Sequence, residues 1–440
     1  MPAPVRLRRA RPYIGGVGEQ GTNPASGAAR ATRVSRRRSV VFVLITAALP
    51  LILVGAAEAV LRVCGLGGYP TTIRRVAKTD GGELCITDAP GPASYFFANR
   101  SKPGSINQCS FLDPKPAGTI RILAAGESAM QGYPQPMGFA STAFLRSMLS
   151  QVWPGRRVEV INLGTTAVAS FPVLGILTEA LEYQPDLVVI YCGNNEYFGA
   201  YGVASLHSAG RSPGAIKFQR WVRSLAVVQG IGKLGPKLSA TDDRTLMEAM
   251  IGRVYIGPRD AVREDAARNF RVHLSQMVDR CKAKGVPVIV CTLACNEKDL
   301  APIGACDETG MAEGDRKLLD SMVVADERRR DEIAARAAAE VRRIAAAWPG
   351  DARARYFLGR ALLNGRDADR ASDEFQAAID LDPMPWRAPS ALNDAIRQLG
   401  FAPGVVLCDV QGEFRAASPE GSIGWELMDD HEHQIGRAHV

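Results

Sequence analysis

The sequence is poor in the residues that most often carry metal and phosphate chemistry. Its 440 residues contain only five histidines, His207, His273, His431, His433 and His439. Among the nine cysteines, Cys291 and Cys295 do not have the spacing of a zinc site, and no histidine cluster accompanies them. A glycine-rich phosphate loop is also missing. These absences argue against metal-assisted chemistry and nucleotide hydrolysis, so we expect no metal and no cofactor.

Basic residues are not in excess beyond the N-terminus. The net charge is +7, but residues 1–38 alone contain nine arginines and one acid, Glu19. Without these residues, the totals of 53 basic and 46 acidic side chains fall to 44 and 45. The positive charge belongs to a tail, and we therefore predict no nucleic-acid partner.

A charge-free apolar run follows this tail. The 19 residues from Ser39 to Ala57 carry no charge, which is about the length that spans a bilayer. The arginines before it predict a cytoplasmic tail (1–38), an inner-membrane, single-pass anchor (39–62) and an extracytoplasmic, periplasmic remainder. A secretory signal cleaved near Ala57-Glu58-Ala59 is one alternative, and a buried helix of a soluble domain is another.

Apolar runs alternate with helical patterns from residue 119 onward. We expect strands at Ile120–Ala125, Val158–Gly164, Asp186–Gly193, Val286–Leu293 and Gly404–Val410. We expect helices at Ser141–Val152, Val173–Glu182 and Glu264–Lys284. This alternation predicts an α/β fold with a doubly wound, mostly parallel sheet, whose ligands bind at the carboxyl ends of the strands. Residues 63–118 are rich in Gly, Pro, Ser and Asn and favour an extracytoplasmic linker, in which Cys85 and Cys109 are candidates for a disulfide.

Residues 313–385 interrupt the α/β pattern. Residues 315–348 are charged and rich in alanine, which favours helix, and the stretch after them resembles a tetratricopeptide (TPR) repeat. The matching packing positions are Leu358, Gly359, Ala371, Phe375, Ala378 and Pro383. A single repeat cannot bury its own apolar face, so we expect a TPR-like helical insertion that packs on the sheet domain. A groove for a protein partner is the alternative.

Glycine and polar residues follow three of the expected strands. The first strand leads into Gly126-Glu127-Ser128, the second ends at Gly164, and the third leads into Gly193-Asn194-Asn195-Glu196. Near the C-terminus, Asp430 precedes His433 by three residues, a spacing that lets the carboxylate hold one imidazole nitrogen. A nucleophilic serine needs such a base and donors for an oxyanion. Taken alone, the cluster at residues 428–433 is more typical of a solvated acidic terminus or an adventitious metal patch.

In this order, the four blocks resemble those of the SGNH, or GDSL-type, serine hydrolase family. The resemblance covers residues 119–312 and 386–434 and implies the flavodoxin-like fold of that family. It implies that Ser128 is the nucleophile, His433 the general base and Asp430 the residue that orients it. The N–H groups of Ser128 and Gly164 and the amide of Asn195 would form the oxyanion hole.

The chain departs from the family pattern at three places. Glu127 and Glu196 stand where the family has aspartate, and residues 435–440, IGRAHV, follow where the family has proline and a closing helix. These six residues match the translation of a common sequencing adapter, so we predict that they are a non-native tail. Further candidates for substrate contact are Glu127, Glu196, Tyr197, Asn296 and Arg387, with packing or solvation as the alternative for each.

The resemblance predicts a membrane-anchored serine esterase or lipase that works through an acyl-enzyme. Its ester substrate would be a lipid or an O-acylated glycan, for instance O-acetyl groups on envelope glycans. An acyltransferase that uses the same residues is one alternative. A non-catalytic envelope scaffold that binds a protein through the TPR-like insertion is another.

Overall fold

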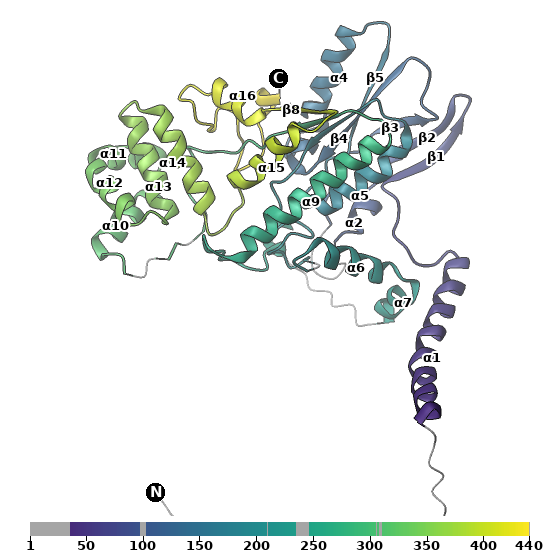
Figure 1. Cartoon of the computed structure of the whole chain (residues 1–440). Helices are drawn as coiled ribbons and strands as arrows, with labels where there is room; N and C mark the ends of the chain where they lie inside the picture. The colour runs from purple at the N-terminus through teal and green to yellow at the C-terminus, as the bar shows by residue number, and fades with distance from the viewer. Residues whose placement is uncertain are drawn as a thin grey trace, which may run out of the picture. The chain divides into compact units, whose positions relative to one another are not determined.

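The computed structural model describes residues 36–96, 103–208, 210–234, 246–304, 306–307 and 310–439. The chain divides into two units, Met1–Ala59 and Val60–Val440, and both β-sheets lie in the second (Figure 1). The first unit is described only by most of α1 (Arg36–Val63). Within α1, Val40–Val63 is long and apolar enough to cross a membrane, with a mean hydropathy of 2.7. Core helices and signal sequences can meet the same criteria, so the anchor stays a prediction.

Five parallel strands form the central sheet. They are β4 (Thr119–Gly126), β5 (Arg157–Asn162), β6 (Leu187–Tyr191), β7 (Val288–Cys291) and β8 (Val405–Cys408). Their spatial order is β5-β4-β6-β7-β8, which is 2-1-3-4-5 in chain order and is typical of doubly wound sheets. The chain therefore has the parallel α/β sheet that the alternating pattern predicts. Most positions of β4 and β6 are buried because helices cover both faces of the sheet.

Helices from distant parts of the sequence cover the two faces. On one face, α5 (Ser170–Ala180), α9 (Ala261–Ala283) and α15 (Ser390–Gly400) pack against one another (Figure 1). On the other, α4 (Ser141–Val152) and α16 (Val410–Ala417) both line a cavity above β4, β6 and β7. The chain also forms the helices α2 (Pro90–Ala93), α3 (Ser128–Gln131), α6 (Pro213–Ser224), α7 (Ala226–Leu234) and α8 (Leu246–Met250).

Residues 63–118, for which the composition favours a linker, contain a folded sheet. Strands β1 (Ile73–Thr79), β2 (Gly82–Thr87) and β3 (Ser110–Asp113) pair antiparallel. Cys85 and Phe111 are buried and belong to the same core cluster as the parallel strands. Short strands between many glycines and prolines give little periodicity, which explains why the pattern did not predict them. Cys85 and Cys109 are both free thiols in this structure.

A buried arginine ties this small sheet to the parallel one. Arg121 lies in β4 and is fully buried. Its guanidinium donates to the carbonyl oxygens of Leu112 in β3 and Tyr183, both at 2.7 Å, and pairs with Glu159 at 2.9 Å. A buried cation is costly unless it is paired, and here each of its three groups of donors has an acceptor. Residues 73–113 are therefore part of the folded unit that carries the site.

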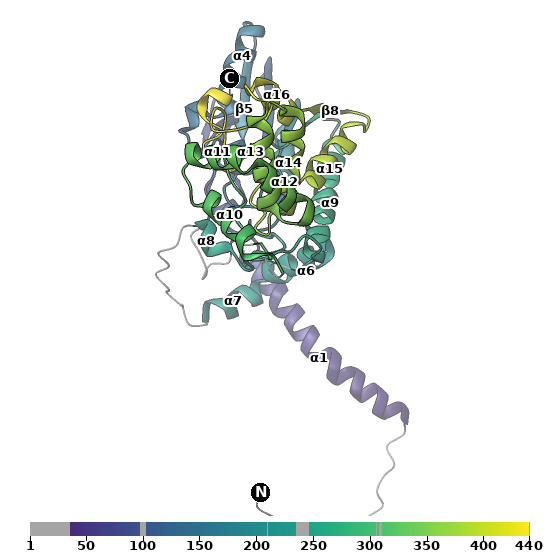
Figure 2. The ribbon, with the colours of Figure 1, turned by 90° about the vertical axis from the view of Figure 1, so that its left-hand side faces the viewer.

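The helical segment after β7 forms a core of its own (Figure 2). It consists of α10 (Glu313–Val323), α11 (Glu327–Arg336), α12 (Ala338–Ala347), α13 (Ala352–Asn364) and α14 (Ala368–Leu381). Gly359 lets α13 and α14 approach, because a Cβ atom there would lie 2.7 Å from the ring of Phe375. Tyr356 donates to the carbonyl oxygen of Lys298 at 2.7 Å and so ties the segment to the sheet domain. The helical character agrees with the expectation, whereas the TPR assignment stays a prediction.

Candidate active site

Ser128 lies at the carboxyl end of β4, as the first residue of α3. The turn requires glycine at 126, because a Cβ atom there would lie 2.0 Å from the carbonyl oxygen of Tyr191 in β6. Chain connections from β4 and β6 leave in opposite directions, which makes this edge the switch point where doubly wound sheets bind ligands. The Ser128 N–H opens a helix and has no acceptor within that helix.

Gly164 lies close to the serine turn, but its N–H is already engaged. A Cβ atom at this position would lie 2.2 Å from the backbone nitrogen of Gln131, so only glycine fits. The Gly164 N–H donates to Oδ1 of Asn162 at 2.8 Å. The Asn162 amide in turn donates to Met130 O at 3.0 Å and Thr142 Oγ1 at 2.9 Å. Asn162 is a structural residue that sequence reasoning missed. The hydrogen bond from Gly164 to Asn162 has to break before the Gly164 N–H can donate to an oxyanion.

Asn195 follows β6 and is buried with its polar groups unsatisfied. Among the described residues, neither Nδ2 nor Oδ1 of Asn195 has a partner in hydrogen-bonding geometry. The Asn195 amide nevertheless lowers the pKa of the Glu432 carboxyl, so the two side chains lie close together. An unsatisfied buried amide is costly, and native proteins keep few of them without a functional reason. The arrangement is that of a donor held ready for an acceptor that is not part of the chain.

Asp430 and His433 form a short contact in the loop before the C-terminus. Nδ1 of His433 lies 2.6 Å from Oδ2 of Asp430, and the His433 N–H donates to Oδ1 of Asp430 at 2.8 Å. Burial alone would raise the pKa of Asp430, but the hydrogen bond and charge of His433 lower it well below its ordinary value. The carboxylate therefore stays ionised and fixes the imidazole. In the described part of the chain, Nε2 of His433 has no hydrogen-bond partner.

A carboxyl oxygen lies close to both the serine and the histidine. Oε1 of Glu432 is 3.4 Å from Oγ of Ser128 and 3.7 Å from Nε2 of His433. The structure thus brings Ser128 and His433 to the same carboxyl oxygen, and no hydrogen bond joins the two side chains directly. Burial and the charges of Glu127 and Asp430 raise the pKa of Glu432 well above its ordinary value, against the hydrogen bond from Ser128 and the nearby amide of Asn195. Glu432 belongs to the DHEH stretch of the sequence, but that pattern does not indicate that its carboxyl lies beside Ser128.

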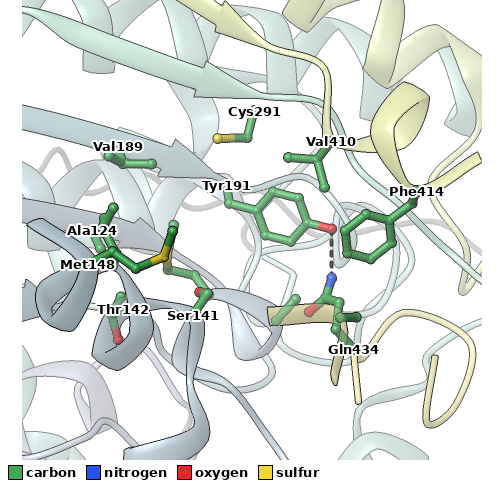
Figure 3. A pocket seen from close by; sticks show the side chains of 14 residues that line it. Ala124, Ser141, Thr142, Met148, Val189, Tyr191, Cys291, Val410, Phe414 and Gln434 are labelled. Carbon is green, nitrogen blue, oxygen red and sulfur yellow. Dashed lines mark hydrogen bonds between the residues drawn. The ribbon is translucent and has the colours of Figure 1, made fainter. Parts of the chain in front are cut away.

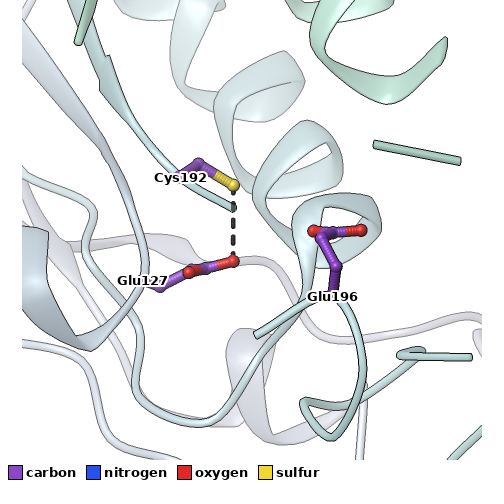
Figure 4. Close-up of side chains that lie close together, drawn as sticks. All are labelled: Glu127, Cys192 and Glu196. Carbon is purple, nitrogen blue, oxygen red and sulfur yellow. Dashed lines mark hydrogen bonds between the residues drawn. The ribbon is translucent and has the colours of Figure 1, made fainter. Parts of the chain in front are cut away.

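Glu127 and Glu196 are both buried, and their side chains lie near each other and near Cys192 (Figure 4). Oε2 of Glu127 accepts from the N–H groups of Asn194 and Asn195, at 2.8 and 3.2 Å, and so braces the loop that carries the Asn195 amide. Oε1 and Oε2 of Glu196 accept from the N–H and hydroxyl of Ser170, at 2.7 and 3.0 Å. Both carboxyls therefore hold backbone segments in position.

Both carboxyls have raised pKa values, and Glu127 contributes to that of Glu196. Burial raises the pKa of Glu127 to about 7, although backbone N–H groups lower it. Burial and the charge of Glu127 raise the pKa of Glu196 to about 8. With Cys192, these side chains bring three ligand-type atoms together. Their oxygens already accept N–H and hydroxyl hydrogens, so the donor set does not fit a cation.

Asn296 and Arg387 lie behind the histidine loop, and both are buried. The Asn296 N–H donates to the carbonyl oxygen of His431 at 3.1 Å, and Arg387 donates to the Asn296 carbonyl oxygen at 3.1 Å. These two predicted substrate contacts therefore support the loop from behind. Tyr197 is buried in a cluster with Phe198, which favours the packing alternative.

Tyr133 lies at the rim of the site, and sequence reasoning missed it. Its ring centroid is 5.1 Å from that of His433 in an edge-on contact, and about half of the side chain is exposed. It stands five residues after Ser128, beyond the end of α3. The only available signal was an aromatic residue soon after the Gly-Glu-Ser triplet.

An apolar cavity of about 290 Å³ lies beside the site, between α4 and α16 (Figure 3). Tyr191 crosses it, and its hydroxyl accepts from Nε2 of Gln434 at 2.9 Å. Ala124 and Val189 reach it from within their strands, so the cavity lies mainly against the face of the sheet and not at its carboxyl edge.

Comparison with known proteins gives matches in structure alone. No protein-family model and no curated protein sequence matches the chain. Twenty-eight chains of solved structures match. One is AlinE4, a SGNH-hydrolase family esterase, with 16% identity and a TM-score of 0.23. That match covers 41% of this chain and 62% of AlinE4, less than two thirds of its length.

Two other matches span more of both chains. A lipase/acylhydrolase from Enterococcus faecalis has 14% identity and a TM-score of 0.31, over 73% of this chain and 89% of that one. The acetyl xylan esterase AlAXEase has 12% identity and a TM-score of 0.33, over 73% and 94%. These neighbours are esterases and lipases. At such identities and TM-scores, the chemistry of this chain has to be argued from its own residues.

Proposed function

We propose that this chain is a serine ester hydrolase with Ser128 as its nucleophile. The observation that carries the proposal is the convergence of three groups on one point at the switch edge of the sheet. Ser128, the unsatisfied amide of Asn195 and the Asp430–His433 pair all face the carboxyl of Glu432. An oxygen atom of this chain already lies in the space that an ester oxygen would need.

In the proposed reaction, Nε2 of His433 takes the proton of Ser128 as Oγ attacks the ester carbonyl carbon. Asp430 holds the other nitrogen, which keeps Nε2 free of its proton and stabilises the imidazolium that forms. The Ser128 N–H and the Asn195 amide donate to the oxyanion. His433 then passes the proton to the leaving alkoxide, and water attacks the acyl-enzyme in a second cycle of the same kind.

Glu432 has to give way in this reaction. Its Oε1 lies close to both Oγ of Ser128 and Nε2 of His433, so in this proposal the ester displaces it before proton transfer begins. A protonated carboxyl leaves more readily than an ionised one, because it carries no charge to hold against His433. The raised pKa of Glu432 therefore favours its displacement.

The finer parts of the proposal follow from the sequence. The substrate would be a lipid or an O-acylated glycan, and residues 39–62 would anchor the enzyme in the inner membrane with its site on the periplasmic side. An acyltransferase would use the same groups and differ in its acceptor. Incubation with a sugar acceptor and mass analysis of the products separates release of free acid from transfer.

Hydrolysis of a panel of p-nitrophenyl esters by the full chain in detergent tests the proposal. We expect Ser128→Ala to lower kcat by at least about 10³-fold, because the residual rate comes from binding and oxyanion donors alone. Ser422→Ala is the matched control: Ser422 is also buried, and its hydroxyl has no partner among the described residues. Equal rates for wild type and Ser128→Ala would refute the proposal.

A further inference from the structure

A second, polar cavity lies between the helical segment and the loop that leads to His433. Its volume is about 430 Å³. One wall comes from α11 and α13, another from residues that follow β7, and the third from residues 419–426. It therefore lies where the helical segment meets the sheet domain, and the proposed reaction does not use it.

Buried, paired charges form the floor of this cavity. The side chains of Lys298, Asp299 and Arg360 are each less than 8% exposed. Arg360 donates to Asp299 Oδ1 at 2.9 Å and to Asp331 Oδ1 at 2.7 Å, while Nζ of Lys298 lies 2.8 Å from Glu420. Buried charges are costly, and this geometry holds donors and acceptors in fixed positions at the cavity wall. The floor is therefore preorganised for a polar ligand.

Trp425 adds an aromatic surface to the same cavity. Its backbone N–H donates to Oδ2 of Asp299 at 2.9 Å, which ties the residue to the floor. The side chain is 41% exposed, and within the described residues its indole has neither a hydrogen bond nor an aromatic contact. A fixed, half-exposed indole offers an apolar face and one N–H donor. Rings that carry C–H bonds on one face and hydroxyls at the edge match this surface.

We propose that this cavity binds an uncharged oligosaccharide, with one sugar ring stacked on Trp425 and its hydroxyls bonded to the polar floor. Hydroxyl groups both donate and accept, which suits a wall of alternating cations and carboxylates. Two cationic and four acidic side chains line the cavity, so its net negative charge repels phosphates and uronates. These charged residues are Lys298 and Arg360 against Asp299, Asp331, Glu420 and Glu426.

The cavity and the proposed catalytic loop share one supporting segment. The N–H groups of Glu297 and Lys298 donate to the Ile423 carbonyl oxygen at 2.8 and 3.1 Å, beside Trp425. The N–H of Asn296 donates to His431, in the catalytic loop. Trp425 and Asp430 are five residues apart and so at most about 18 Å from each other. A short oligosaccharide spans this distance, and the inference that it carries the acyl group rests on the proposed esterase function.

Calorimetric titration tests the proposal directly. The full chain in detergent, as Ser128→Ala to prevent turnover, is titrated with xylotetraose, cellotetraose, N-acetylated chitotetraose and tetragalacturonate. We expect at least one uncharged tetrasaccharide to bind with a Kd below about 1 mM, and Trp425→Ala to weaken it at least tenfold. Asn364→Ala, at the rim of the cavity, should weaken the binding of this tetrasaccharide less than Trp425→Ala does. Trp221→Ala, which removes an exposed tryptophan of α6, should leave the Kd unchanged.

Three results would overturn the inference: no uncharged ligand binds, only the uronate binds, or binding persists in Trp425→Ala. Since Ser128→Ala cannot turn over, binding is measured independently of the proposed reaction. Conversely, labelling of Ser128 by a fluorophosphonate in the Trp425→Ala single variant reports whether the site is folded and reactive. Failure of the glycan inference and failure of the esterase proposal are thereby distinguishable.

Discussion

The buried pair Glu127 and Glu196 makes the stability of the fold depend on pH in a specific direction. The pKa of Glu196 rises from 4.5 to about 8 on folding, chiefly through burial and then through the charge of Glu127. The folded state therefore holds a proton that the unfolded state releases. Its stabilising effect is complete below the unfolded pKa and is lost as pH rises through the folded pKa, here between about 4.5 and 8.

Glu196→Gln is the perturbation that isolates this effect. Glutamine can accept from the Ser170 N–H with its carbonyl oxygen and donate to the Ser170 hydroxyl with its amide, so both contacts can persist. One pKa unit corresponds to about 1.4 kcal/mol, so wild type loses about 3 kcal/mol through this group between pH 5 and pH 7. We expect the free energy of unfolding of the variant to fall by about 3 kcal/mol less over this range.

Urea unfolding of the full chain in detergent at pH 5, 6, 7 and 8, followed by tryptophan fluorescence, measures this difference. Glu313→Gln is the matched control, because Glu313 is exposed and its surface ion pair contributes little. Its pH dependence should equal that of wild type. If wild type and Glu196→Gln lose stability in parallel from pH 5 to pH 8, the buried carboxyl is not protonated in the fold and the reasoning fails.

Three further substitutions test the active site through ester hydrolysis. Asn195→Ala should lower kcat about 10²- to 10³-fold with little change in KM, and an unchanged kcat would exclude it as an oxyanion donor. Asp430→Asn should lower kcat by up to about 10⁴-fold while circular dichroism stays that of wild type; a small effect would mean that Asp430 does not orient the base. Wild-type kcat/KM should fall as the pH rises and Glu432 ionises, and Glu432→Gln should abolish this fall. Equal pH profiles would contradict the proposal that the ionised carboxyl hinders the reaction.

The sequence predicted the central elements well, because their patterns are local. The helix at Ser141–Val152 has the predicted bounds, and each of the five expected strands is present in a parallel sheet. Apolar stripes and continuous apolar runs record which faces are buried. The sheet at residues 73–113 escaped prediction, since Arg121 and the core hold short strands whose own pattern is weak.

The contacts within the site were much harder to predict. Sequence order correctly indicated that Ser128 and Asn195 follow neighbouring strands, because parallel strands end at one edge. It did not indicate that Asn162 accepts the Gly164 N–H or that Glu432 lies close to both Ser128 and His433. Both contacts depend on loop conformations and rotamers, which leave no periodic signal. The catalytic roles themselves stay predictions until they are measured.

Covalent labelling tests the role of Ser128 most directly. The full chain in detergent is incubated with a fluorophosphonate, digested and examined by peptide mass spectrometry. An activated serine should carry the phosphonyl group on the peptide that contains Ser128, whereas Ser128→Ala should take up none and Ser422→Ala should label as wild type does. His433→Ala should slow the labelling strongly, because no base then takes the proton. Labelling that is absent from wild type, or equal in wild type and Ser128→Ala, would contradict a nucleophilic serine at this strand end.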